Sequence, residues 1–276
     1  MSISTITPEA EDRYPVASLS MFDPVHLGID EYGYGVDVEL VYHPILIAGE
    51  PGAGKSVCLN NIVAHGALSV EDCSLWLFDG KQVELGLWAD VADVFVGPDM
   101  TMALLRLRQL QHEMNRRYAE LARVNRRKIT KADPVPVILF VIDELAYYSV
   151  TTGTKDQREE FMILLRDIIA RGRAAGLVVV AATQRPSADI IPTSLRDLFG
   201  YRLAFRCTTD SSSDIVLSVG WAGQGFSAKD IAPEDRGIGL LLAEGGIPRR
   251  MKSAYLSDAD IYSLVEYARQ LRRRRS

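Results

Sequence analysis

Residues 43–60 decide how this chain folds, and they read HPILIAGEPGAGKSVCLN. The apolar run Ile45–Ala48 predicts a buried strand, and a helix is expected to begin at Lys55. Between them, Gly49 to Ser56 follow the spacing G-x-x-x-x-G-K-S. Because a strand precedes this loop and a helix follows it, the stretch predicts a phosphate-binding loop rather than a glycine-rich turn with a chance lysine. We therefore expect the chain to bind a nucleoside triphosphate.

The residue types in this loop suit phosphate chemistry. Glycines let the backbone curl so that successive N–H groups point at phosphate oxygens, and the following helix presents its positive end. Lys55 is expected to reach the β- and γ-phosphates, and the Ser56 hydroxyl to bind Mg²⁺. Contacts with ATP are predicted over nine consecutive residues: Gly49, Glu50, Pro51, Gly52, Ala53, Gly54, Lys55, Ser56 and Val57.

The composition is that of a globular protein. Of 276 residues, 47% are hydrophobic and 24% charged, which fits one large domain or one domain with a small addition. A net charge of −5 argues against a basic wrapper for nucleic acid, so any such contact is expected from a local patch. No apolar run approaches the roughly 18 residues of a membrane span, and the N-terminus lacks a signal peptide's apolar segment. The three scattered cysteines predict buried thiols in a reducing cytoplasm.

From Ile45 onward, short apolar segments alternate with amphipathic ones. This alternation predicts an α/β fold with a mostly parallel sheet and helices on both faces. A hairpin is expected over 22–42, before the nucleotide core. Strands are expected at 45–48, 74–78, 137–142, 177–183, 201–206 and 238–242, and helices at 55–67, 99–126, 156–173, 210–219 and 257–274. We divide the chain into a flexible arm (1–21), a core domain (22–256) and an amphipathic helix with a basic tail (257–276).

A second group of polar residues follows the apolar strands. Asp143 and Glu144 come directly after the strand 137–142. An aspartate at that position is expected to coordinate Mg²⁺, directly or through water, and the adjacent glutamate to polarise the attacking water. This pair favours a hydrolase over a P-loop kinase. Gln184, after the next strand, either senses the γ-phosphate or is an ordinary strand-end amide.

Several cations can be interpreted in two ways. Arg171 and Arg173 end a helix, so they either complement its dipole or reach the phosphate of a neighbouring subunit. Arg272–Arg275 likewise suit the end of the last helix. The helix 99–126 and its following turn form either a solvated face with pairs such as Glu113–Arg117 or a patch for DNA phosphates. Their cations are Arg106, Arg108, Arg116, Arg117, Arg123, Arg126, Arg127, Lys128 and Lys131.

Taken together, these motifs resemble the FtsK/SpoIIIE family of DNA translocases over roughly residues 24–245. The segments that carry the resemblance are the phosphate loop from His43, Val141–Ala146, Arg173–Gly176, Ala182–Ser187, Glu113–Tyr118, Arg202–Phe205 and Asp79-Gly-Lys81 with Glu84-Leu85. In the last of these, Gly80 stands where the family has proline. The compact form is most similar to the short Tra-type transfer proteins of actinomycete mobile elements.

The resemblance implies a RecA-like ATPase core that closes into a hexameric ring and moves double-stranded DNA. By position, it makes Lys55 and Ser56 ligands of phosphate and Mg²⁺, Asp143 the acid on the metal side and Glu144 the residue that activates water. Gln184 then resembles a γ-phosphate sensor, and Arg173 an arginine finger that serves the next subunit.

The large division translocases carry N-terminal membrane spans and a C-terminal winged helix, and the pattern of this sequence predicts neither. A cytoplasmic protein is therefore expected, held at the inner face of the membrane through a membrane-bound partner, the arm or the arginine tail. The alternative is a related ATPase that moves protein substrates in a type VII-like secretion system.

Overall fold

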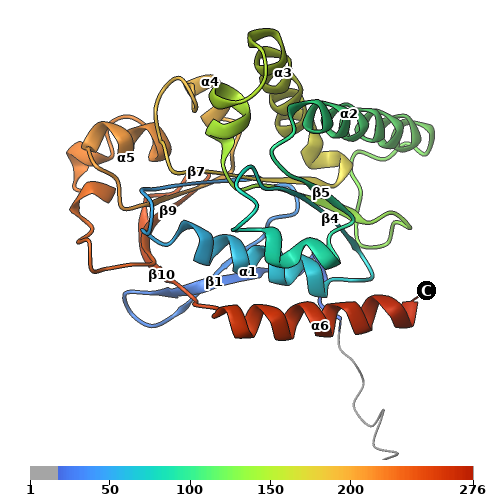
Figure 1. The fold of residues 1–276 in the computed structure, drawn as a ribbon, viewed down its shortest axis with the longest axis horizontal. Helices are drawn as coiled ribbons and strands as arrows, with labels where there is room; N and C mark the ends of the chain where they lie inside the picture. The colour runs from blue at the N-terminus through green and yellow to red at the C-terminus, as the bar shows by residue number, and fades with distance from the viewer. Residues whose placement is uncertain (1–17, 276) are drawn as a thin grey trace, which may run out of the picture.

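The computed structural model describes residues 18–275, with side chains described as far as Arg273. Ten strands form one sheet in the order β2-β1-β10-β9-β8-β3-β7-β6-β4-β5 (Figure 1). The strands are β1 Val25–Asp30, β2 Gly35–Val38, β3 Ile45–Ala48, β4 Cys73–Phe78, β5 Val94–Val96, β6 Val137–Ile142, β7 Leu177–Thr183, β8 Tyr201–Phe205, β9 Ile238–Ala243 and β10 Arg249–Ser253. The helices are α1 Lys55–Leu68, α2 Met100–Arg123, α3 Lys155–Gly172, α4 Thr193–Arg196, α5 Asp210–Leu217 and α6 Asp258–Arg275.

The sheet is mixed and mostly parallel, as the alternating pattern predicted. From β8 to β5 neighbouring strands run parallel, and β9, β10, β1 and β2 add an antiparallel end. Every residue of β3, β6 and β7 is buried, which fits central parallel strands covered on both faces. These three strands have the predicted bounds. The strands β5 and β10 were not predicted.

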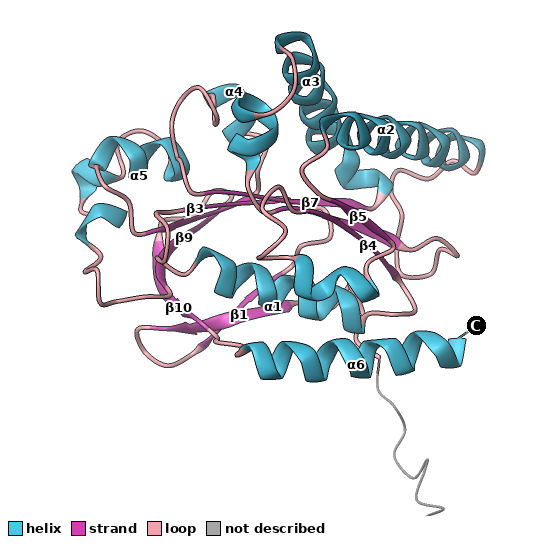
Figure 2. Cartoon of the chain, viewed as in Figure 1, coloured by secondary structure: helices cyan, strands magenta, loops and turns pink. Residues whose placement is uncertain are grey.

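Helices cover both faces of the sheet, with α2, α3, α4 and α5 on one side and α1 and α6 on the other (Figure 2). The antiparallel end of the sheet curls so that β1 packs against α1 (Figure 1). Helix α1 is buried around most of its circumference, and Asn61 donates to the backbone carbonyl of Ala254 at 2.8 Å. The helix that begins at the phosphate loop is therefore enclosed in the core, which holds its first turn in place.

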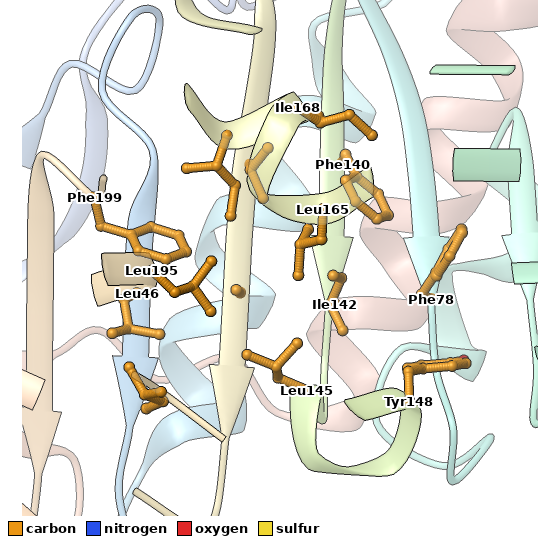
Figure 3. Close-up of a cluster of buried hydrophobic side chains, with 14 of the residues drawn as sticks. Leu46, Phe78, Phe140, Ile142, Leu145, Tyr148, Leu165, Ile168, Leu195 and Phe199 are labelled. Atoms are coloured by element: carbon orange, nitrogen blue, oxygen red, sulfur yellow. The ribbon is translucent and has the colours of Figure 1, made fainter. Parts of the chain in front are cut away.

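The α2–α3 side of the core supports the carboxyl ends of β4 and β6 (Figure 3). Phe78 and Phe140 pack edge to face with ring centres 4.8 Å apart. Tyr148, on the turn after β6, stacks on Phe161 of α3 at 5.3 Å. Such aromatic pairs favour a single side-chain arrangement. They fix the turn that follows Glu144.

The chain ends differ partly from the predicted division. Residues 1–17, most of the predicted arm, lie outside the described residues, whereas residues 18–21 pack on the core domain. Met21 is buried, and Leu19 donates its N–H to the carbonyl of Leu68 at 3.1 Å. Helix α6 packs against α1 and the 3₁₀ segment Gly86–Val91, so its apolar stripe completes the same core.

Two further predictions can be compared with the described residues. Helix α2 ends at Arg123 rather than at 126, because Asn125 adopts a left-handed backbone with φ 53°. The cysteines are buried and unbridged, and burial raises the pKa of Cys58 and Cys207 to about 12. Across residues 18–275, no helix combines the length and apolar character needed to cross a bilayer.

Candidate nucleotide site

The phosphate loop connects β3 to α1 at the carboxyl edge of the parallel strands. The Gly49 N–H donates to Thr183 of β7 at 3.3 Å, and the Glu50 N–H donates to the Arg206 carbonyl, just beyond β8, at 2.9 Å. Gly52 and Gly54 have φ values of 76° and 119°, which favour glycine. Helix α1 begins at Lys55, and its N-cap residue Gly54 provides no side-chain cap, so the first N–H groups of the helix point towards the loop. This arrangement suits an anion such as a triphosphate.

A charged clamp that sequence reasoning did not identify braces the loop. Glu50 forms an ion pair with Arg206 at 2.7 Å, and the Thr208 hydroxyl donates to the same carboxylate. On the other side, Gly237 donates its N–H to the Ala53 carbonyl at 2.9 Å. These partners come from segments that are remote in sequence, so no local pattern could have revealed them.

Lys55 and Asp143 meet in a buried ion pair. Their side chains are 2% and 0% exposed, and Lys55 Nζ lies 2.9 Å from Asp143 Oδ1. Burial raises the pKa of Asp143, and the Lys55 ammonium opposes that shift. The second carboxylate oxygen, Oδ2, is buried without a hydrogen-bond partner in the described structure. This buried, unpartnered carboxylate oxygen and the hydroxyl of the half-buried Ser56, which follows Lys55 in the sequence, are ligand types that suit Mg²⁺.

Glu144 is held by the end of the neighbouring strand. Its Oε1 accepts from the Thr183 hydroxyl at 2.6 Å, and its Oε2 accepts from the Gln184 N–H at 3.0 Å. Lys81 donates to Gln184 Oε1 at 2.8 Å and lies 3.7 Å from Glu144 Oε2. The fold therefore brings Lys55, Asp143, Glu144 and Gln184 to one edge of the sheet. Thr183 and Lys81 lie at the same edge. Both residues belong to motifs that were singled out in the sequence, but neither was predicted as a site residue.

Arg173 lies away from this edge. It follows α3 and precedes β7, whose seven residues span roughly 20 Å before they reach Thr183. Its guanidinium donates to the Leu198 carbonyl at 2.6 Å and lies 3.4 Å from Glu244. Arg171 instead makes two hydrogen bonds of 2.6 Å with Asp167 on its own helix. Neither arginine reaches the Lys55 site of its own chain.

Most cations of the basic helix are paired with nearby acids. The expected Glu113–Arg117 pair is present at 2.7 Å, and Arg116 contacts the same carboxylate. Other pairs are Arg108–Glu160, Arg123–Glu120, Arg126–Asp133 and Lys131–Asp23. Arg117 was counted with the surface cations, but its side chain is only 4% exposed because its guanidinium donates to the Ala175 carbonyl at 2.9 Å. These pairs favour the structural interpretation of the patch.

A phosphate loop at the carboxyl edge of a mostly parallel sheet, with two acids at the end of a neighbouring strand, defines the class of P-loop ATPases. Residues 20–135 match the family model of the FtsK/SpoIIIE family. It is 30% identical over 259 residues to the DNA translocase FtsK of Borreliella burgdorferi, covering 88% of this chain and 31% of that protein. With DNA translocase FtsK of Treponema pallidum the identity is 31% over 267 residues, covering 89% and 31%. The chain thus spans about a third of the length of these relatives.

Solved structures share the fold. The pCW3 conjugation coupling protein TcpA, with ATPγS, superposes with a TM-score of 0.77 at 23% identity, covering 94% of this chain and 75% of that one. The cytoplasmic domain of the type VII secretion ATPase EccC from Thermomonospora curvata gives 0.72 at 20% identity, covering 97% and 32%. At these identities the likeness concerns the fold alone.

Proposed function

We propose that this chain is the ATP-hydrolysing motor of a translocase for double-stranded DNA, which works as a hexameric ring in conjugative or intermycelial transfer. The observation that carries the proposal is the cluster of Lys55, Asp143, Glu144 and Gln184 at one sheet edge. The relatives named DNA translocases support DNA as the substrate. The type VII secretion ATPase shares the fold, which is compatible with a protein substrate. Because this likeness concerns the fold alone, transport of protein is the second candidate.

In the proposed mechanism, the loop N–H groups and Lys55 bind the triphosphate, and Lys55 exchanges its contact with Asp143 for phosphate oxygens. Ser56 and Asp143 would hold Mg²⁺, which neutralises charge on the phosphates. Glu144 accepts a proton from the attacking water, while the Thr183 hydroxyl and Gln184 N–H keep its carboxylate in place. The side-chain amide of Gln184 senses the γ-phosphate.

Arg173 serves the adjacent subunit in this proposal. Its position beyond the amino end of β7 is too far from the Lys55 site of its own chain, which supports action in trans. A guanidinium beside the transferring phosphoryl group neutralises charge in the transition state. The Glu244 and Leu198 contacts hold Arg173 in place on its own subunit. Membrane recruitment would use a membrane-bound partner or the arginine tail, although Arg272 already lies 3.3 Å from Asp93.

The test is ATP turnover with and without duplex DNA, at low and moderate salt. Duplex DNA should stimulate turnover, and the stimulation should weaken with salt because DNA binding releases counterions. Lys55→Ala should lose ATP binding, whereas Glu144→Gln should bind ATP without turning it over. If ATP turnover does not change with DNA but increases with a secreted peptide substrate, the second candidate is favoured. Wild-type turnover in Glu144→Gln would refute the assigned base.

A further inference from the structure

Lys81 contacts both residues that the proposed mechanism places around the attacking water. Its Nζ donates to Gln184 Oε1 at 2.8 Å and lies 3.7 Å from Glu144 Oε2. Glu144 follows β6, Gln184 follows β7 and Lys81 follows β4. One ammonium group therefore links the ends of three strands at the nucleotide edge.

The backbone that carries Lys81 is wrapped around one buried carboxylate. Asp79 is fully buried, and its Oδ1 accepts from the N–H groups of Lys81 at 3.0 Å and Gln82 at 2.8 Å. Its Oδ2 accepts from three more N–H groups, those of Glu84, Leu85 and Gly86, at 3.2, 2.8 and 3.1 Å. Hydrogen bonds to an ionised acceptor are among the strongest in proteins. These hydrogen bonds fix the backbone of the loop, and they therefore fix the position from which the Lys81 side chain extends.

Gly80 explains how the loop approaches the residues after Glu144. A Cβ built on Gly80 would lie 2.6 Å from two ring carbons of Tyr147. Tyr147 in turn donates its N–H to the Glu144 carbonyl at 3.1 Å. The glycine that replaces the family's proline thus lets the Lys81 loop pack directly on the turn that carries Glu144.

We propose that Lys81 is a positioning residue for ATP hydrolysis, which holds the Glu144 carboxylate and the Gln184 amide in one geometry. The proposal rests on the proposed function above. Among the described residues, Lys81 is the side-chain hydrogen-bond partner of Gln184, and that bond is lost without it. Glu144 Oε2 then keeps only the hydrogen bond from the Gln184 N–H within the described structure. Because a displacement of about 1 Å can lower a rate by about 10², Lys81→Ala should lower kcat by roughly 10- to 100-fold. ATP affinity should fall much less than kcat, because Lys81 acts through Glu144 and Gln184, whereas the phosphate loop and Lys55 hold the triphosphate.

The experiment measures kcat by steady-state ATP turnover and ATP affinity by direct titration with a labelled nucleotide, on the full chain. Lys81 is 37% exposed, so Lys81→Ala should fold. Lys81→Arg should recover part of kcat because it restores a donor and a charge. The double variant Lys81→Ala/Gln184→Ala should lose less than the product of the two single losses, because the two residues act as one unit. Lys155→Ala is the matched control, since Lys155 forms an exposed pair with Glu159 at 3.6 Å, and it should keep wild-type turnover.

Unchanged or increased kcat in Lys81→Ala, a matching loss of ATP affinity, or independent losses in the double variant would overturn the inference. A wild-type chain that does not hydrolyse ATP would overturn the proposed function and the inference together. If the wild-type chain hydrolyses ATP and Lys81→Ala does so at the same rate, the inference is wrong but the proposed function stands.

Discussion

Arg117 should contribute more to stability than any exposed arginine of α2, because it anchors the turn that carries Arg173. Its guanidinium lies 2.7 Å from Glu113 and 2.9 Å from the Ala175 carbonyl, and its side chain is 4% exposed. Arg117→Gln leaves the Ala175 carbonyl without its partner, which costs about 1–3 kcal/mol of stability. It also removes the charge-assisted hydrogen bond to Glu113, which contributes about the same amount. Because these terms overlap, we expect a loss of about 2–4 kcal/mol in the free energy of unfolding.

The matched control is Arg116→Gln. Arg116 contacts the same carboxylate, but its side chain is 54% exposed, so its loss should cost about 0–1 kcal/mol. Urea denaturation followed by tryptophan fluorescence gives both free energies, and the melting temperature of Arg117→Gln should fall by roughly 3–7 °C. If Arg117→Gln is no less stable than Arg116→Gln, the guanidinium does not anchor the turn and the reasoning is wrong.

The remaining predictions concern the loop, an acid and the ring. Gly54→Ala should lower ATP affinity at least about tenfold, because a φ of 119° strains any residue that has a Cβ. The circular dichroism spectrum should not change, and an ATP affinity equal to that of the wild type would contradict this prediction. Hydrogen bonds from Arg116, and then from Arg117, lower the pKa of Glu113 from 4.5 to about 2, so its stabilisation is complete above about pH 5 and is lost as the pH falls towards 2. The stability gap between wild type and Glu113→Gln in urea titrations should therefore narrow over that range, and a constant gap would refute the pairing. Arg173→Ala should assemble and bind ATP but hydrolyse it poorly, and mixing it with Lys55→Ala should restore some turnover; mixed rings, confirmed by mass, that stay inactive would refute action in trans.

The parts of the site that are local in sequence could be predicted. The loop from Gly49 to Ser56 and the pair Asp143-Glu144 each follow an apolar strand, and carboxyl ends of parallel strands meet at one edge. The strands β3 and β6 were found because they are entirely apolar, and β7 because it is apolar up to Thr183 at its end. The strand β10 was missed because it reads RRMKS, in which only Met251 and Ser253 are buried.

Contacts between remote segments could not be predicted. Arg117 has the same residue type and spacing as its exposed neighbours, and it is buried only because the turn before β7 approaches α2. Lys81 reaches Gln184 because β4 and β7 both flank β6, a strand order that the sequence does not state. The clamp between Glu50 and Arg206 likewise depends on β8 lying beside β3.

The central claim is ATP-driven movement along double-stranded DNA, and displacement of a third strand tests it most directly. A labelled triplex-forming strand is placed on a duplex at increasing distances from the loading end, and its release is followed in time. The account predicts release with ATP, a delay that grows with distance, and no release by Glu144→Gln or with ATPγS. Hydrolysis of ATP on the same duplex without release of the third strand would contradict it.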